Sequence, residues 1–234
     1  MDDPDELVVG EPSGRLPLRI LRRRRSELLG FIGSVNDLRL VDVGCGNGRL
    51  LGNLPGSGSR FGADLSIGML QRFPAGAANG LVQASATRLP FADGSFDLTL
   101  CLNMLQYLDD GGTSQALAEL LRVTRPGGRI ILHVKNSASP VGLSRRLSQL
   151  VRRAGGKDRV VNETYRSPRW YRSALATEAH LIGGYSYGLH PIGWAPDRWL
   201  RRFIMLEEMV RTRLPNHGFG VDCFLKFRVG DAGK

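Results

Sequence analysis

The chain of 234 residues has little of what metal centres, disulfide scaffolds and membrane spans require. Its three cysteines are odd in number and far apart, at Cys45, Cys101 and Cys223, and its four histidines show no paired ligand spacing. These counts argue against a disulfide framework, and we predict that the chain binds no metal. No apolar run approaches the length that a membrane-spanning helix needs.

The first residues also lack the features of a targeting signal. The run 1–6 is acidic, whereas secretory and mitochondrial signals carry basic residues near their start. Together with the unpaired cysteines, this predicts a reducing, cytoplasmic location. The length fits one α/β domain with a modest insertion, and we expect no second catalytic domain.

Lysine is scarce as well, with four residues against 28 arginines, and the net charge is +10. The excess of basic side chains lies in residues 15–33 and 137–172, whereas residues 38–136 are nearly balanced. Because arginine is abundant throughout, a solvated basic surface is the first interpretation. An anionic substrate, an acidic carrier or an anionic membrane surface remains the alternative. The chain has no aromatic-rich basic stripe, so a nucleic-acid partner is not expected.

Strand-like and helix-like segments alternate through residues 38–136. The expected strands of this region are 40–43, 60–64, 81–84, 96–102 and 129–134. Two more are expected at 184–187 and 221–227. Such alternation predicts a parallel sheet with helices on both faces.

The richest stretch is the first strand with the loop that follows it. The apolar strand runs directly into three alternate glycines, Gly44, Gly46 and Gly48, with Asp42 just upstream. Glycine has no Cβ, so the backbone can turn sharply here and approach a ligand closely. Asp64 ends the second strand about twenty residues later, where α/β nucleotide sites place an acid that accepts the ribose hydroxyls. We expect one helix to start after the glycines and Ser66 to open the next.

Four blocks in this order carry a resemblance to a known family. They are Val41–Gly48, Gly62–Ser66, Leu89–Asp97 and Leu121–Gly128. The chain resembles the class I S-adenosylmethionine-dependent methyltransferases, in the small-molecule (type 11, quinone-biosynthesis-like) branch. The resemblance implies a Rossmann-like, seven-stranded, mostly parallel sheet with helices on both faces, in a single domain with a lid insertion. It also implies S-adenosylmethionine as cofactor and S-adenosylhomocysteine as product.

The resemblance divides the chain into four parts. Residues 1–37 would be an acidic tail and a lid helix, 38–136 the cofactor-binding core, 137–172 a substrate lid, and 173–234 the completion of the sheet with an inserted amphipathic helix. We expect one helix at 141–154 and another that starts near Pro168. A stripe at helical spacing, Trp199, Phe203, Leu206, Val210 and Leu214, is expected to be core or a dimer contact. Monomer and homodimer both remain open.

The N-terminal helix carries four consecutive arginines, at positions 22–25. Four helical residues sweep about 300° around the axis, so at least one arginine must lie near the apolar stripe. It would either pair with the methionine carboxylate of the cofactor or extend along the surface of the helix.

The resemblance also implies a cofactor site at the ends of the strands. The implied residues are Asp42, Gly44, Cys45, Gly46, Asp64, Leu65, Met69, Ser85, Ala86, Leu102 and Asn103. Asp42 would stabilise the positive amino or sulfonium region, Asp64 the ribose, and Leu65 with Met69 the adenine. Ser85 stands where family members usually carry an aspartate for the adenine amino group, so this contact should be weaker.

The expected reaction is methyl transfer to an O or N atom, or a C atom, of a small biosynthetic molecule by in-line displacement. A base helps only where the acceptor carries a proton. The candidates are His133, Tyr165 and His190, each without an identifiable partner, so the catalytic residue stays unknown. An RNA methyltransferase and a noncatalytic cofactor-binding interaction protein are the alternatives.

Overall fold

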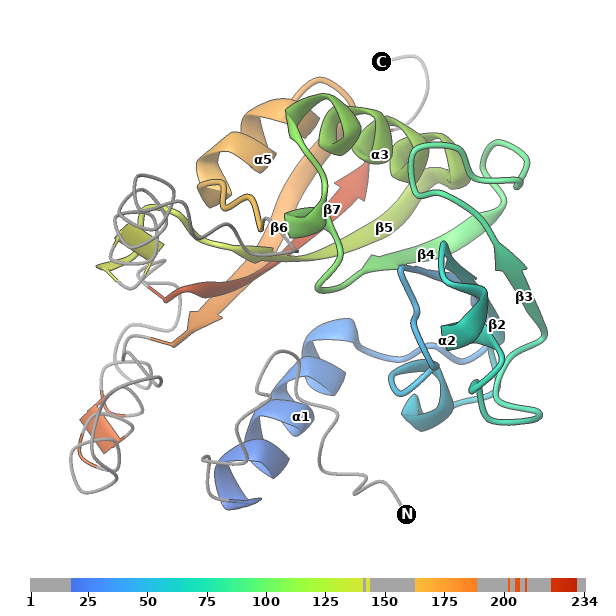
Figure 1. The fold of residues 1–234 in the computed structure, drawn as a ribbon, viewed down its shortest axis with the longest axis horizontal. Helices are drawn as coiled ribbons and strands as arrows, with labels where there is room; N and C mark the ends of the chain where they lie inside the picture. Colours follow the sequence, from blue (N-terminus) through green and yellow to red (C-terminus); the bar gives the residue numbers. More distant parts are fainter. Residues whose placement is uncertain are drawn as a thin grey trace.

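The structure is a computed structural model, and it describes residues 18–140, 142–143, 163–188, 202, 205–206, 209 and 220–230. One sheet dominates the described part (Figure 1). Its strands are β1 (Arg39–Val43), β2 (Ser59–Asp64), β3 (Gly80–Gln83), β4 (Phe96–Cys101), β5 (Thr124–Lys135), β6 (Ala179–Tyr187) and β7 (Asp222–Val229). They lie in the order β3-β2-β1-β4-β5-β7-β6. The expected fold class, a seven-stranded and mostly parallel sheet, is confirmed.

The direction of the strands decides where a ligand site lies. β1 is parallel to β2 and β4, β2 to β3, and β4 to β5, whereas β7 runs antiparallel to β5 and β6. Lys135 at the end of β5 therefore pairs with Asp222 at the start of β7. The ends of five parallel strands and the first residue of β7 share one edge of the sheet, which is where open α/β sheets bind ligands.

Helices cover both faces of this sheet, as Figure 1 shows. On one face, α1 (Leu18–Ile32) buries Leu28 and Ile32 in a core that includes Phe224. On the other face, α3 (Asp110–Val123) and α5 (Pro168–Leu175) pack in the larger core. Burial of apolar side chains on both faces fits the nearly continuous apolar runs of the central strands.

One helix expected in the first half of the chain differs from the structure. After the glycine loop there is only the 3-10 turn η2 (Leu51–Asn53), because Gly52 and Pro55 disfavour a longer helix. Ser66 does cap the short helix α2 (Ile67–Leu70), since its hydroxyl accepts from the Met69 amide. A second 3-10 turn, η3 (Leu105–Tyr107), follows β4.

The later strands are longer than expected. β5 begins at Thr124, before the glycines at 127 and 128, because Thr124 pairs with Phe96 across a bulge in the register. β6 begins at Ala179, which pairs with Val229, and an irregularity in the register follows between Leu181 and Gly183. In both strands, glycines within the paired region conceal the strand pattern in the sequence.

The expected helices at 141–154 and 199–214 lie largely outside the described residues. Within the stripe of the second helix, the structure describes Leu206, whose side chain is 49% exposed, so it is not a core residue. Among the described helices, none combines the length and the apolarity that a membrane span requires. The three cysteines are buried free thiols.

Candidate functional site at the carboxyl edge of the sheet

The turn after β1 is bonded to the end of β2. The Gly44 and Cys45 amides both donate to the Ala63 carbonyl, at 2.7 and 3.2 Å. The next amide, of Gly46, donates to Asp64 Oδ2 at 2.8 Å, and the Ser66 amide donates to Asp64 Oδ1 at 2.8 Å. The Asp64 carboxylate is thus held by two backbone donors, which fixes its direction and leaves its remaining lone pairs for a ligand.

The three glycines of this turn differ in the space that a side chain would find there. All have positive φ angles, of 80° at Gly44, 54° at Gly46 and 78° at Gly48. A Cβ at Gly44 would lie 2.7 Å from the Met104 side chain, and one at Gly48 would overlap the Phe73 ring. A Cβ at Gly46 would meet nothing within 4 Å. Gly44 and Gly48 are therefore needed for packing, whereas Gly46 borders open space.

Asp42 supplies a buried negative group in the same place. Its side chain is 3% exposed, and its Oδ1 atom has no hydrogen-bond partner among the described residues. Burial, and then the charge of Asp64, raises the pKa of Asp42 from 3.8 to about 7. A carboxylate in this position is stabilised by a cation that a ligand brings. The positive region of S-adenosylmethionine fits this requirement.

Apolar side chains are exposed directly after Asp64. Leu65 is 70% exposed, Ile67 52% and Met69 42%, in and before the short helix α2. Three neighbouring apolar residues in water are costly unless something covers them. Leu65 and Met69 were expected to cover an adenine ring, and the exposed Ile67 beside them was not among the residues that the sequence indicated.

The residues after β3 are partly engaged within their own loop. Ser85 Oγ lies 2.8 Å from Thr87 Oγ1 and accepts from the Thr87 amide at 3.2 Å. Ala86 packs at the margin of the larger core. A hydroxyl that already serves its loop is a weaker partner for an adenine amino group than a carboxylate would be.

The end of β4 brings further polar atoms to this edge. Leu102 is buried, and Asn103 adopts a left-handed backbone conformation with φ of 57°, which is uncommon outside glycine. The Oδ1 atom of Asn103 and the Oε1 atom of Gln106 are buried without a partner among the described residues. Buried acceptors of this kind call for donors that a ligand can supply.

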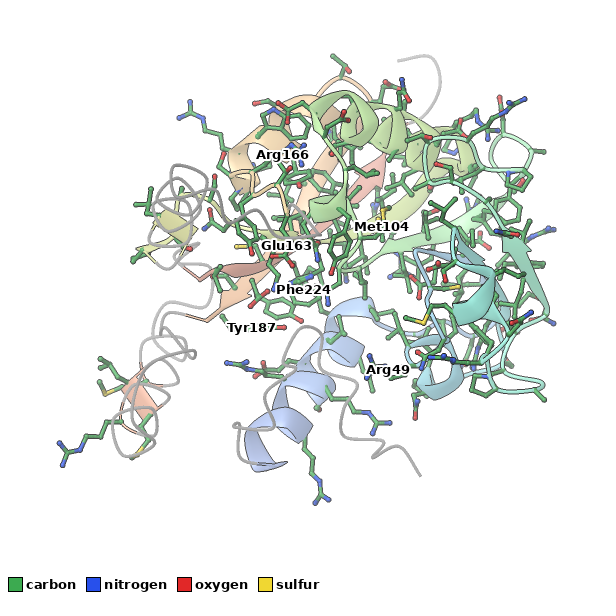
Figure 2. All side chains as sticks on the ribbon, in the orientation of Figure 1. Arg49, Met104, Glu163, Arg166, Tyr187 and Phe224 are labelled. Carbon is green, nitrogen blue, oxygen red and sulfur yellow. The ribbon has the colours of Figure 1, made fainter. Side chains whose placement is uncertain are left out.

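At the ends of β5 and β7, three charged or polar side chains are buried together. His133 Nε2 lies 3.0 Å from Asp222 Oδ1, and the Lys135 ammonium binds the same oxygen. His133 was expected to have no partner, and that expectation was wrong, because β7 brings Asp222 to it from 89 residues away. The Phe224 ring packs on His133 with the ring centres 4.6 Å apart, and the Tyr187 ring lies beside the Phe224 ring (Figure 2).

Of the two other candidates for the base, the structure describes only Tyr165. The Tyr165 hydroxyl donates a short hydrogen bond to the Glu163 carboxylate, so it too has a partner that the sequence did not indicate. Figure 2 shows Glu163 between Arg166 and Phe224. His190 lies outside the described residues.

Arg166 fixes the chain where it returns to the sheet after the expected lid. Its Nε atom donates to Asp110 Oδ1 at 2.8 Å, and Nη2 donates to the Leu108 carbonyl at 3.1 Å. The Ser137 amide donates to the Arg166 carbonyl, and the Thr164 amide to the Gln106 carbonyl. Both ends of the segment therefore meet beside η3, a role of Arg166 that no sequence pattern indicated.

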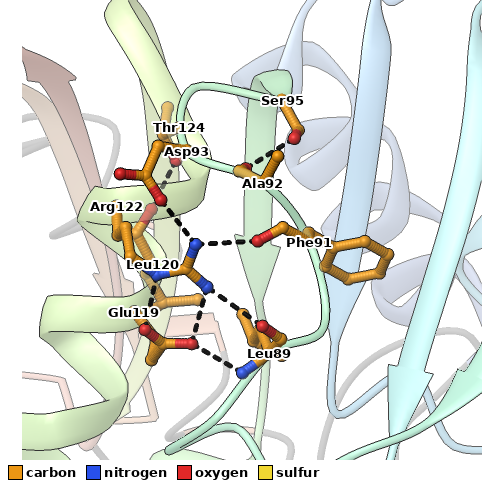
Figure 3. A network of polar contacts seen from close by, with 9 residues as sticks. All are labelled: Leu89, Phe91, Ala92, Asp93, Ser95, Glu119, Leu120, Arg122 and Thr124. Carbon is orange, nitrogen blue, oxygen red and sulfur yellow. Dashed lines mark hydrogen bonds and ion pairs between the residues drawn. The ribbon is translucent and has the colours of Figure 1, made fainter.

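Two of the four blocks that carry the family resemblance, Leu89–Asp97 and Leu121–Gly128, contact each other. Arg122 in α3 donates to Glu119, to Asp93 and to the carbonyls of Leu89 and Phe91, all within 2.7–3.0 Å (Figure 3). Glu119 in turn accepts from the Leu89 amide at 2.6 Å. This network holds the loop before β4 against α3 and so sets the position of that strand.

One arginine of α1 lies inward, as the helix geometry required. Arg24 is 3% exposed, and its guanidinium lies 4.2 Å from the centre of the Tyr187 ring. Arg25 instead donates to Asn53 beyond the glycine loop. The expected pairing of an arginine with the methionine carboxylate stays a prediction.

Comparison with known proteins agrees with this geometry. The family model described as a methyltransferase domain matches residues 41–132. The demethylmenaquinone methyltransferase of Mycolicibacterium vanbaalenii is 42% identical over 118 residues, which are 49% of this chain and 48% of that protein. The chain spans about half the length of most curated relatives it matches.

Solved structures share the whole fold at low identity. A chain from the complex between the Haloferax volcanii Trm112 methyltransferase activator and a methyltransferase has a TM-score of 0.63 at 21% identity, covering 90% of this chain and 89% of that one. The magnesium protoporphyrin IX methyltransferase of Synechocystis, solved with bound SAH, has a TM-score of 0.59 at 14% identity, covering 94% and 90%. Residues 41–132 therefore match the methyltransferase domain family, and the sheet that they help to form has the fold of the S-adenosylmethionine-dependent methyltransferases.

Proposed function

We propose that this chain transfers the methyl group of S-adenosylmethionine to an O or N atom, or a C atom, of a small molecule. The observation that carries the proposal is the Asp64 carboxylate, held by the amides of Gly46 and Ser66 beside the open space at Gly46. A fixed acid at the end of the second strand is the group that accepts ribose hydroxyls in α/β nucleotide sites. When bound, S-adenosylmethionine supplies an electrophilic methyl group, so the protein needs no covalent nucleophile.

Each part of the proposed cofactor site has a chemical counterpart. Asp42 pairs with the positive amino or sulfonium region, and Asn103 Oδ1 accepts a hydrogen bond from the amino group. Leu65, Ile67 and Met69 cover the adenine ring, which removes apolar surface from water on both sides. The backbone around Gly46 lines the methionine part. The residues thus bind and orient, and exclude water from the methyl group.

Two lines of support favour a small acceptor. The relative from Mycolicibacterium vanbaalenii and the structural neighbour from Synechocystis are both named for small-molecule acceptors. In this chain, η3 and residues 163–166 are bonded together next to the cofactor edge, so they border this side of the site at the level of Gln106. A bordered site of this kind suits a small molecule better than a folded RNA.

Calorimetry with S-adenosylmethionine and S-adenosylhomocysteine tests the proposed cofactor site. We expect Asp64→Ala to weaken binding of both about 30- to 1,000-fold, because one or two charge-assisted hydrogen bonds to the ribose are lost. Asp93→Asn is the matched control, since Asp93 is exposed and pairs with Arg122 far from this edge. Equal affinities of both variants and the parent protein would contradict the site.

Transfer itself is measured with S-adenosylmethionine labelled in its methyl group. A panel of quinols, phenols, amines and carboxylic acids is compared with total RNA as the receiving material. We expect label in the small molecules of one class. Label in RNA alone supports the RNA methyltransferase alternative, and tight cofactor binding without label anywhere supports the noncatalytic alternative.

A further inference from the structure

At the edge next to the proposed cofactor site, β5 and β7 bury a carboxylate, an ammonium and an imidazole in mutual contact. Asp222 Oδ1 binds both the Lys135 ammonium and His133 Nε2. The His133 side chain is 0% exposed, and those of Lys135 and Asp222 are 9% and 10% exposed. Because a buried charge is costly unless it is paired, the Lys135 side chain stabilises the ionised form of Asp222 inside the protein.

The hydrogen bond from Nε2 decides which nitrogen of His133 carries the proton. An ionised carboxylate only accepts, so Nε2 must donate and the neutral ring must have its lone pair on Nδ1. That Nδ1 atom is buried and has no hydrogen-bond partner among the described residues. A buried acceptor without a donor is costly, and in a folded protein it marks a place where a ligand or water supplies the donor.

Burial favours the neutral form of the ring. Burial lowers the pKa of His133, and Lys135 lowers it further, while the bond to Asp222 acts in the opposite direction. The other groups near the ring are Phe224, which packs on it at 4.6 Å, and Tyr185, which stacks on Phe224. From α1, Arg24 lies over Tyr187 rather than over the imidazole. Lys226 lies further along β7 over Phe31, and β4 brings no charged side chain between Leu98 and Leu102.

Resting on the proposed function, we propose that His133 is the proton acceptor for the atom that is methylated, with Asp222 and Lys135 as its positioning residues. The acceptor is then an O–H or N–H group rather than a carbon atom. As its oxygen or nitrogen bonds to the methyl carbon, its proton moves to His133 Nδ1, and the electron pair of the broken carbon–sulfur bond stays on sulfur. The imidazolium keeps its Nε2–H bond to Asp222 and later releases the extra proton to solvent.

The kinetic test compares acceptors that need a base with acceptors that do not. A nitrophenol that is already ionised at the assay pH is paired with unsubstituted phenol, whose pKa is about 10 as in tyrosine. We expect His133→Gln to slow transfer to phenol about 100- to 10,000-fold, the usual range for loss of a general base. Transfer to the nitrophenolate should change by less than about fivefold, because no proton has to be removed.

His180→Gln is the matched control, because His180 is an exposed histidine on the same sheet, away from this edge. Equal losses on both phenols overturn the proposal, since they indicate a structural role for His133. Transfer to carbon acceptors only also overturns it. Failure of the proposed function is a separate result, because it is read from calorimetry with the cofactor.

A second variant and a second measurement guard against misfolding of the glutamine variant. Lys135→Met removes the positive charge that lowers the pKa of His133, so the lower limb of the pH–rate profile should move to higher pH. Nitrogen NMR of histidine-labelled protein should show a proton on Nε2 and none on Nδ1 at neutral pH. A proton on Nδ1 at that pH overturns the proposal without any acceptor.

Discussion

Replacement of Asp42 by asparagine tests the electrostatics of the cofactor edge most directly. Burial and the neighbouring Asp64 raise the pKa of Asp42 from 3.8 to about 7. Each tenfold change in an acid constant is worth about 1.4 kcal/mol, so the ionised carboxylate costs the folded protein about 4 kcal/mol above pH 7. The asparagine side chain has nearly the same shape and no charge, so the variant should be more stable than the parent protein at high pH.

The sign of the effect with pH follows from the raised pKa. Protonation favours the folded state, so the contribution of Asp42 is favourable below about pH 4 and is lost as the pH rises towards 7. In urea unfolding, the free energy of unfolding of Asp42→Asn should therefore exceed that of the parent protein by about 4 kcal/mol at pH 8 and about 2 kcal/mol at pH 5. At pH 3 the two proteins should be alike.

Asp97→Asn is the control with the opposite sign. Burial disfavours ionisation of Asp97, but hydrogen bonds from the Arg39 amide and from Arg125 outweigh it and lower its pKa. This variant should lose stability at neutral pH. If Asp42→Asn is no more stable than the parent at pH 8, or gains equally at pH 3, the reasoning is refuted.

Cofactor binding near pH 7 should also release protons in the parent and not in the variant, which calorimetry in buffers of different ionisation enthalpy measures.

The remaining predictions separate packing from ligand contact. Gly44→Ala should destabilise the fold by about 2 kcal/mol or more, because its Cβ would lie 2.7 Å from Met104 at a positive φ. Gly46→Ala should cost only about 1 kcal/mol by thermal unfolding yet weaken cofactor binding, and the opposite ranking would contradict the open space at Gly46. Arg122→Met should cost about 2–3 kcal/mol, since it breaks a network of four partners. Arg125→Met should cost less than about 1 kcal/mol, because its side chain is 53% exposed, and equal losses would mean that the network is not stabilising.

The sequence predicted those features that depend on local patterns. Apolar runs located all seven strands, Ser66 was recognised as a helix cap, and Asp64 was expected at the end of β2. The same local reasoning failed where the chain has competing signals. Gly52 and Pro55 stopped the helix expected after the glycine loop, and glycines within β5 and β6 hid the beginnings of those strands.

The sequence could not predict contacts that only the tertiary fold creates. Asp222 reaches His133 across 89 residues, because β7 enters the sheet beside β5 in the reverse direction. Arg166 reaches Asp110 across 56 residues at the point where the chain returns to the sheet. Neither acid stands at a recognisable spacing from its partner, so no motif joins them. A side chain would collide with Met104 at Gly44 but not at Gly46. This difference could not be predicted, because Met104 lies 60 residues from Gly44 along the chain.

Two buried aspartates at one edge of the sheet divide the proposed reaction between them. Asp222 is buried with Lys135, whose charge, together with the bonds from His133 and Lys135, outweighs the effect of burial and lowers the pKa of the acid. Asp42 has no such cation among the described residues, and its pKa is raised. Only Asp42 therefore gains from a positive ligand, which favours the proposed place of the sulfonium region at the end of β1 over one at β5. At the end of β5 the charges of Lys135 and Asp222 already balance each other, and Nδ1 of His133 can accept a hydrogen bond. In the proposed reaction this end therefore binds the methyl acceptor, which gives up a proton.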